Sequence, residues 1–306
     1  MEQTNTKPLR LALATNAAFS LTSGLMMVLL PSLIAGWLGV QAAWILQAIG
    51  IGLILFAADL IHQATRPRLA TWRALYASAA DFLWVLGSLV VVAVAGGTFS
   101  FLGATLILAV AAVVLLFGCW QLWAIGQAHR LPGSELFRHC IRVSVNRPAD
   151  AMWTIIARFG DIQRHMPSLR HSSILDDRAP GVGAVRVCED RGGKRWAEEC
   201  VAFDAGRSFD VRFVAEAPDF PFPAKSMHGG WEVTPQGDGS EVTVWWELEP
   251  KRPLLAPLLL PLLAFQADRD FQGVIRSMAA AAHGGATEPR EPEPSPVVVR
   301  LLPTLC

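Results

Sequence analysis

The chain has 306 residues, of which 52% are apolar and only 17% are charged, and its formal net charge is zero. A wholly soluble protein of this size is normally less apolar, so the composition argues against that class. A nucleic-acid-binding chain would carry a basic excess, so we expect no nucleic-acid partner. Most of the charged residues lie in the second half, which predicts two parts of different character.

Two long uncharged stretches fill the first half, residues 11–58 and residues 82–128. About 20 apolar residues are enough to cross the hydrocarbon core of a bilayer as a helix. Pro and Gly interrupt the first stretch within Pro31–Ala42, and a Gly-Gly-Thr run interrupts the second within Gly96–Ser100. The pattern therefore predicts four transmembrane helices, over about Leu9–Ile34, Ala43–Thr65, Trp72–Ala95 and Phe99–Arg130.

The basic residues of this half lie at the same ends of the predicted helices. They are Lys7, Arg10, Arg66, Arg68, Arg73 and Arg130, and the two interrupting turns contain no Lys or Arg. Because Lys and Arg concentrate in the cytoplasmic loops of membrane proteins, we expect both termini and the second half to be cytoplasmic. The chain is then an integral protein of the cell (inner) membrane, with the lipid bilayer as a partner.

Two acidic residues, Asp59 and Asp81, fall inside the predicted membrane helices. A charge in a membrane is costly, so such residues are candidates for a proton or substrate path. Both also lie near the basic helix ends, where an ion pair would anchor the helix, and we favour this structural role. The available partners are Arg66, Arg73 and His62. We expect hydrogen bonds between helices from Asn16, Gln47 and Gln121.

The second half alternates between apolar and polar residues in short runs, which is typical of β-strands. The first strand is predicted over Phe137–Val145, followed by a helix over Ala149–Phe159 and a short helical piece over Asp161–Met166. Further strands are predicted over Ser172–Asp176, Val182–Cys188, Arg195–Phe203, Ser208–Glu216, Ser226–Thr234 and Glu241–Glu249. One-sided alternation in these runs predicts an antiparallel sheet with one face in water.

A final helix is predicted over Leu254–His283, with Phe271, Val274, Ile275 and Met278 on one apolar stripe. Residues 284–306 are rich in Pro and Glu, and we expect most of this tail to be disordered. The predicted domains are thus a four-helix transmembrane domain over residues 1–130, an α+β domain over residues 134–283, and the tail.

The order of a strand, two short helices, antiparallel strands and a long final helix resembles the SRPBCC or START-like superfamily. The closest likeness is to its polyketide cyclase/dehydrase and lipid transport branch. It is carried by VNRPADAMWTIIARFGDIQRHMPSL, GVGAVRV, WAEECVAFDAGRSFDVRF and WEVTPQGDGSEVTVWWELEP. The resemblance implies a helix-grip fold, in which a curved antiparallel sheet wraps the long last helix around a hydrophobic cavity. The first half is similar to small four-helix bacterial integral membrane proteins of unknown function.

A cavity of this kind suits an apolar ligand with one or two polar groups. On the predicted alternation, the ligand-binding side chains are Trp153, Phe213, Trp231, Trp246, Phe271 and Ile275. The alternative for each of them is that it fills a small apolar core. We expect a lipid or another small hydrophobic molecule as the partner of this domain.

Enzymes of this fold need acid–base groups that point inward, and the candidates are His165, His171, His228 and Glu198. None is paired at a recognisable spacing, and the chain has no HExxH, Gly-rich phosphate loop or GxSxG motif. We therefore expect no catalytic residues, no metal and no cofactor. The five cysteines form no CxxC pair, and we interpret them as free thiols.

Two functions from different classes remain open. The first is a membrane-anchored binding module that holds or transfers a lipid or another small hydrophobic molecule. The second is a membrane-tethered cyclase or dehydratase that acts on a hydrophobic substrate, because the superfamily contains binding proteins, cyclases and hydratases and its fold does not fix function. A third possibility is that the four helices transport a molecule and the soluble domain regulates them.

Overall fold

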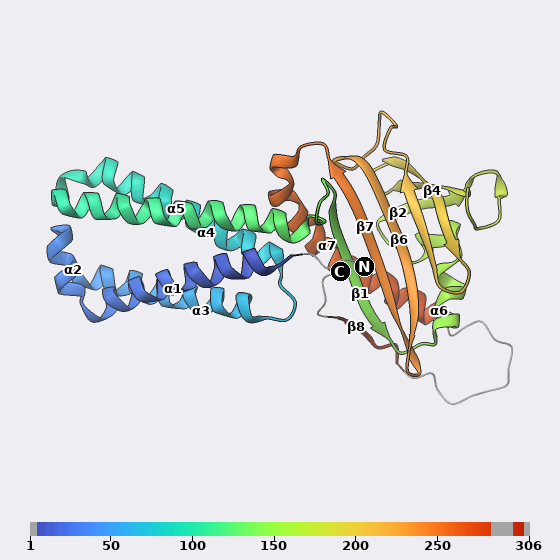
Figure 1. Cartoon of the computed structure of the whole chain (residues 1–306), viewed down its shortest axis with the longest axis horizontal. Coiled ribbons are helices and arrows are strands. Elements are labelled where there is room, and N and C mark those ends of the chain that lie inside the picture. The colour runs from blue at the N-terminus through green and yellow to red at the C-terminus, as the bar shows by residue number, and fades with distance from the viewer. Residues whose placement is uncertain (1–4, 283–295, 303–306) are drawn as a thin grey trace. The chain divides into compact units, whose positions relative to one another are not determined.

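The computed structural model describes residues 5–282 and 296–302. Contacts between residues divide these into two compact units, whose elements are labelled in Figure 1. The helical unit comprises residues 5–129 together with residues 257–262. The α+β unit comprises residues 130–256 together with the described residues from 263 onward.

The helical unit confirms the four predicted apolar helices. The spans Lys7–Leu29, Ala43–Thr65, Thr71–Thr98 and Phe101–His129 are long and apolar enough to cross a membrane. The elements are α1 (Lys7–Leu29), α2 (Pro31–Leu38), α3 (Ala43–Thr65), α4 (Thr71–Ala95), the 3-10 turn η1 (Gly96–Thr98) and α5 (Phe101–His129).

The predicted turn at Pro31–Ala42 contains a short helix, α2, so the first long helix ends at Leu29 rather than at Ile34. Pro31 begins α2 because the first helical turn needs no amide hydrogen from that residue. Gly39 ends it with a left-handed backbone at φ 78°, a conformation that glycine adopts without steric penalty.

The two intramembrane acids have different partners. Asp59 on α3 forms an ion pair with Arg73 on α4, which confirms the structural role expected for it. Asp81 on α4 is buried and instead accepts hydrogen bonds from Asn16 Nδ2 on α1 (2.9 Å) and Gln121 Nε2 on α5 (2.8 Å). The expected pairing of Asp81 with a basic helix end is therefore wrong, because its side chain faces α1 and α5. The expected bonds between helices from Asn16 and Gln121 are confirmed.

The α+β unit contains one antiparallel sheet in the order β2-β3-β4-β5-β6-β7-β1-β8. The strands are β1 (Phe137–Val145), β2 (Leu169–Ile174), β3 (Val185–Asp190), β4 (Arg195–Asp204), β5 (Ser208–Phe213), β6 (Ala224–Gln236), β7 (Gly239–Pro250) and β8 (Val299–Leu301). β1 has the predicted bounds. β2 lies three residues earlier at its start than predicted and ends before Asp176 and Asp177, whose φ values of 60° and 47° interrupt an extended strand.

The α+β unit also contains helices. They are α6 (Ala149–Ile156), the 3-10 turns η2 (Phe159–Arg164), η3 (Leu175–Asp177) and η4 (Pro253–Leu255), and the long α7 (Ala256–Ala281), of which residues 257–262 belong to the helical unit. Figure 1 shows α7 running along one face of the sheet. Its residues Val274, Ile275 and Met278 are buried in one core with Val143 and Trp231 of the strands. This arrangement confirms the predicted helix-grip fold.

The other face of the sheet carries paired charges. Arg138 on β1 forms an ion pair with Glu247 on β7, and Arg142 on β1 forms one with Glu241 on β7. Opposite charges across neighbouring strands stabilise a sheet by a few tenths of a kcal/mol to about 1 kcal/mol each. This face is therefore polar, as the alternation predicts, but the side chains of the two pairs are only 11–31% exposed.

β8 lies within the tail, of which we expected most, but not all, to be disordered. The strand pairs with β1, with Val299 opposite Val145 and Leu301 opposite Val143. Its one β-branched residue, Val299, suits an extended strand, and β8 covers the edge of β1. Residues 284–295 and 303–306 of the predicted tail lie outside the described residues.

The cysteines differ from one another. Cys119, Cys188 and Cys200 carry free thiols, whereas Cys140 is disulfide-bonded. The interpretation as free thiols is wrong for Cys140, since spacing along the chain does not show which sulfur atoms the fold brings together. Cys306 lies outside the described residues.

Candidate functional site

A cavity of about 460 Å³ lies between the sheet and α7, inside the α+β unit. Sites for small molecules have volumes of about 300–1,000 Å³, so this cavity is large enough for a ligand. Strands β3 to β7, the segment around η2 and the middle of α7 all contribute to its lining. Its apolar wall includes Met166, Leu169, Val211, Met227, Val244 and Leu248.

Four of the six residues predicted to bind ligand line this cavity: Phe213, Trp231, Trp246 and Phe271. The Phe271 ring is stacked on that of Trp246, with ring centres 5.9 Å apart, and is tilted against that of Trp231 at 5.8 Å. These rings come from α7, β7 and β6. The predicted meeting of the long helix with the aromatic residues of the sheet is therefore present.

The other two predicted residues do not line the cavity. The Trp153 ring packs against Phe203 and Phe209, with ring centres 5.6 Å and 6.4 Å away. Ile275 lies one turn beyond Phe271 on α7 and is completely buried in the core that also contains Met152 of α6. Near Ile275, α6 and α7 share one buried core with the sheet. The apolar stripe of α7 therefore lines the cavity at Phe271 and belongs to the packed core at Ile275.

One glycine makes room for the aromatic wall. A Cβ atom on Gly229 of β6 would lie 3.1 Å from the Trp245 backbone oxygen and 3.5 Å from the Phe213 ring. Glycine within a strand often marks such a close approach. Gly229 therefore allows the close approach of the β7 backbone at Trp245 beside the aromatic wall.

An aromatic loop that sequence reasoning missed borders the cavity. It runs over residues 214–223, between β5 and β6, and its residues Pro221, Phe222 and Pro223 line the cavity. The Phe222 ring packs edge-on against Trp196 at 5.3 Å and against Phe213 at 5.9 Å. The loop has no strand or helix period, and only its sequence DFPFP signals that it carries apolar groups.

A buried ion pair forms the polar part of the wall. Arg186 on β3 lies directly opposite Glu198 on β4, the two side chains form an ion pair, and both line the cavity. Arg186 Nη1 also donates to the Phe159 carbonyl oxygen (2.8 Å), and its guanidinium lies 4.3 Å from the centre of the Phe159 ring. Trp196 Nε1 donates to Glu198 Oε1 at 2.6 Å.

Sequence reasoning singled out Glu198 but missed Arg186. The signal was available in the alternation of β3, where Arg186 takes the same face as the buried Ala184 and Cys188. An arginine on a buried strand face requires an acidic partner on a neighbouring strand.

The charges in this cluster are fixed by their neighbours. Burial alone would lower the pKa of Arg186, but Glu198 and Cys188 outweigh it and raise the pKa, so the guanidinium stays charged. Burial, reinforced by the nearby Glu198, raises the pKa of the Cys188 thiol to about 12. Because the thiolate is the reactive form of cysteine, Cys188 is a neutral thiol and not a nucleophile.

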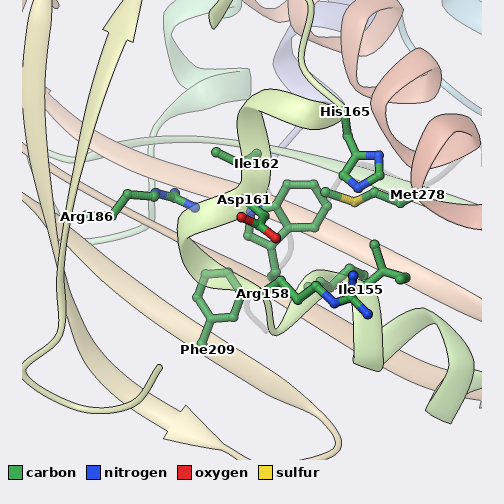
Figure 2. Close-up of a pocket in the computed structure, with 10 residues that line it drawn as sticks. Ile155, Arg158, Asp161, Ile162, His165, Arg186, Phe209 and Met278 are labelled. Carbon is green, nitrogen blue, oxygen red and sulfur yellow. The ribbon is translucent and has the colours of Figure 1, made fainter. Parts of the chain in front are cut away.

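The histidine candidates lie elsewhere. His165 borders a small pocket of about 10 Å³, with room for roughly one water molecule, which shares Arg186 with the cavity. Figure 2 shows His165 beside Met278 on one side of this pocket and Arg186 on the other. His165 Nδ1 lies 3.0 Å from Ser277 Oγ. His171 is exposed on β2, and neither it nor His228 on β6 is among the residues that line this pocket or the cavity.

Among residues 5–282 and 296–302, none of these histidines forms a hydrogen bond with Glu198. Within the same residues, no group of three or more His, Cys, Asp or Glu side chains could hold a metal ion. The arrangement therefore offers a largely apolar enclosure with a neutralised ion pair, Arg186–Glu198, in its wall and with further charged lining residues, Asp190, Lys194 and Asp270.

A second, apolar cleft of about 1,090 Å³ lies in the helical unit. Residues of all five helices line it, among them Met27, Leu38, Ile49, Trp84 and Ile107. In helices long enough to cross a bilayer, such a surface is filled by the acyl chains of lipids. It does not distinguish a specific ligand from the surrounding membrane.

Comparison with known proteins gives one family. Residues 138–283 match the family described as polyketide cyclase/dehydrase and lipid transport, which confirms the resemblance found in the sequence. No curated protein matches the chain in sequence.

Similar solved structures each cover about half of this chain. They include Ara h 8.0201 (13% identity, 49% of this chain and 99% of that chain, TM-score 0.39). Norcoclaurine synthase from Thalictrum flavum, in complex with dopamine and hydroxybenzaldehyde, has 15% identity over 50% of this chain and 88% of that chain, with a TM-score of 0.37. Ginseng major latex-like protein 151 from Panax ginseng has 17% identity over 49% of this chain and 99% of that chain, with a TM-score of 0.37.

Proposed function

Because residues 138–283 form an SRPBCC/START-like domain, we propose that the chain is a membrane-anchored binding module. Its α+β domain holds or transfers a lipid or another small hydrophobic molecule. The observation that carries this proposal is the cavity of about 460 Å³ enclosed by Phe213, Trp231, Trp246 and Phe271. A packed core would leave no such volume, since protein interiors have few voids larger than a water molecule.

The wall of the cavity supports an uncharged ligand. Arg186 and Glu198 are paired with each other and make further hydrogen bonds, so neither is available to pair with a charged group of a ligand. The other charged lining residues are Asp190, Lys194 and Asp270. The volume is too small for both acyl chains of a phospholipid. A single-chain or fused-ring molecule with one hydroxyl or carbonyl group is both uncharged and small enough for the cavity.

The four apolar helices support the membrane anchor. Their basic ends favour a cytoplasmic position for both termini and for the α+β domain. The binding module would then take its ligand from, or deliver it to, the cytoplasmic side of the inner membrane.

The alternative is a membrane-tethered cyclase or dehydratase, and the observation in its favour is the Arg186–Glu198 pair in the cavity wall. A general base must be able to accept a proton from the substrate. Glu198 already accepts hydrogen bonds from Arg186 and Trp196, and Cys188 is a neutral thiol. The geometry therefore favours binding over catalysis.

The test is mass spectrometry of small molecules that copurify with the full-length protein in mild detergent. Ala267 of α7 lines the cavity, so Ala267→Trp fills it, and Ala280→Trp on the exposed side of the same helix is the matched control. We expect a hydrophobic molecule with the wild type and with Ala280→Trp, but not with Ala267→Trp. Equal recovery from all three proteins would refute binding in the cavity.

The same molecule decides between the two functions. After incubation with the purified wild-type protein, a binding module returns it unchanged, and an enzyme returns a cyclised or dehydrated product. Conversion that is lost in Glu198→Gln would establish the enzyme.

A further inference from the structure

An uncharged, leucine-rich segment lies at the start of α7. We define the apolar segment as residues 253–265, PLLAPLLLPLLAF, which comprise η4 and the first turns of α7. No charged residue occurs before Asp268. A helix that is apolar on all sides belongs in a protein core or in a membrane, not in water.

Only one stripe of the apolar segment is covered by the protein. Ala256, Leu260 and Ala264 are buried at intervals of four residues. The remaining leucines and Phe265 are exposed, with Leu254 at 93% and Leu262 at 55% of full exposure. A continuous exposed apolar surface of this kind marks a site of interaction with a membrane or with another protein.

The apolar segment leads directly into the cavity. Leu263 is both exposed and part of the cavity lining, and the next turns of α7 add Gln266, Ala267 and Phe271 to that lining. A hydrophobic molecule that moves along the exposed leucines therefore reaches the cavity without crossing a charged surface on this helix.

Two observations favour a bilayer as the partner. Lys251 and Arg252 immediately precede the apolar segment, and basic residues beside an apolar helix face are attracted to anionic lipid headgroups. Only residues 130–136 separate α5 from β1. Fully extended, these residues reach roughly 25 Å, so the α+β domain stays beside any bilayer that α5 crosses.

We infer that the apolar segment inserts into the headgroup–acyl boundary of the bilayer and forms the entrance through which the hydrophobic ligand exchanges between membrane and cavity. This inference rests on the proposed binding function and adds to it the partner and the route. An interfacial helix of this type sinks its apolar face about 5–10 Å into the boundary region.

Insertion is tested by photo-crosslinking in the full-length protein. Leu254 is replaced by the photoreactive residue p-benzoylphenylalanine, and the control carries it at Asp238, in the exposed turn between β6 and β7. Both proteins are reconstituted in nanodiscs of phosphatidylethanolamine and phosphatidylglycerol. We expect phospholipid adducts by mass spectrometry at position 254 and none at position 238. Protein adducts alone at position 254, or equal lipid adducts at both positions, would overturn insertion.

The route is tested with N-phenyl-1-naphthylamine, an uncharged fluorescent probe that accepts excitation energy from tryptophan. The double variant Leu254→Glu/Leu258→Glu places charges on the apolar segment, and Leu175→Glu is the matched exposed leucine outside it. Binding in detergent micelles should be equal in all proteins, since none of these residues lines the cavity. Uptake from vesicles should be slower by about tenfold in the double variant only.

Failure of the proposed binding function can be distinguished from failure of the proposed entrance. If the wild type does not bind the probe in detergent and retains no copurified molecule, the proposed binding function fails. If the probe binds and the double variant takes it up from vesicles as fast as the wild type, the binding function stands and the entrance is refuted.

Discussion

Arg186 on β3 and Glu198 on β4 form an ion pair with side chains that are only 5% and 6% exposed, in the wall of a largely apolar cavity. Removing two charges from water is costly, and the pair is tolerated only when further hydrogen bonds satisfy both partners. Phe159 supplies such a bond to Arg186, and Trp196 supplies one to Glu198. The pair therefore connects the cavity wall to η2. It also contributes to the polarity of that wall.

Breaking this pair should strongly destabilise the protein. Glu198→Ala leaves the Arg186 charge buried without its partner, which typically costs about 3–5 kcal/mol. The neighbouring Glu199 also pairs with an arginine, Arg212, at 3.0 Å but in a partly exposed position, so Glu199→Ala should cost no more than about 1 kcal/mol. Chemical denaturation in detergent, followed by tryptophan fluorescence, measures the loss of unfolding free energy in both variants. Similar losses in the two variants would contradict a buried, functional pair.

Phe271 and Ile275 should respond differently to truncation. Ile275 is fully buried in the core, so Ile275→Ala should cost about 2–5 kcal/mol of unfolding free energy. Phe271 borders a space that is already empty, so Phe271→Ala should cost less than the 3–5 kcal/mol typical of a packed phenylalanine. It should instead allow larger apolar probes to bind. A large loss of stability with an unchanged range of bound probes would show that Phe271 is a packing residue.

His165 should make stability depend on pH. Burial lowers the pKa of His165 below its ordinary value of 6.5, and the charge of Arg164 lowers it further. The unfolded chain then binds the proton more readily, so the stability associated with neutral His165 is fully present above pH 6.5 and is lost as the pH falls through the folded pKa.

Denaturation of the wild type and of His165→Gln between about pH 5 and 8 measures this effect. The glutamine can keep a hydrogen bond to Ser277 but does not titrate. The wild type should lose more stability toward low pH than the variant does. Parallel pH profiles would contradict the assignment to His165.

Much of the architecture could be predicted because long-range physical patterns encode it. Uncharged stretches of membrane length define the helices, and two-residue alternation defines strands such as β1 and β7. The same alternation placed Phe213, Trp231 and Trp246 on the inner face, and the apolar stripe of the last helix placed Phe271 opposite them. All four residues line the cavity.

The misses have specific causes. Trp153 and Ile275 share the right face, but a periodic pattern does not show where a cavity ends and packing begins. Arg186 was missed because charged residues in strands are mostly exposed, and only the register of β3 with β4 shows that Glu198 lies opposite it. β8 could not be predicted from a Pro- and Glu-rich tail, because three extended residues gain stability only from the β1 edge that they pair with.

The side of the membrane on which the α+β domain lies remains a prediction. Single cysteines at Gly97 in η1 and at Asp238 in the β6–β7 turn report the two sides, since a side chain at Gly97 meets no neighbouring atom. Asp238 is preferable to the adjacent Gly237, whose φ of 56° disfavours a cysteine. In intact cells, an impermeant maleimide should label position 97 and not position 238. The reverse pattern would place the domain outside.

The last prediction concerns β8 and the edge of β1. Asn146, at the end of β1, donates from Nδ2 to the Pro296 carbonyl oxygen (3.0 Å) and accepts at Oδ1 from the Val298 amide (2.8 Å). Pro296 and Val298, which make these bonds, come just before Val299 in the chain, and Val299 pairs with Val145 in the sheet. An exposed strand edge presents unpaired backbone groups that promote self-association. In mild detergent, which covers the exposed apolar segment, a fragment over residues 130–302 should therefore unfold cooperatively and stay monomeric, since a domain of this length can bury its own core.

A fragment that ends at residue 283 lacks β8, and we expect it to be less stable and to associate with itself. Asn146→Ala in the longer fragment is the matched control, because it removes the two side-chain bonds but keeps the strand. Each net hydrogen bond contributes about 0.5–1.5 kcal/mol, so this variant should fall between the two fragments in unfolding free energy. Denaturation and sedimentation velocity measure stability and association. If both fragments were equally stable and monomeric, β8 would be dispensable and the edge of β1 would need no cover.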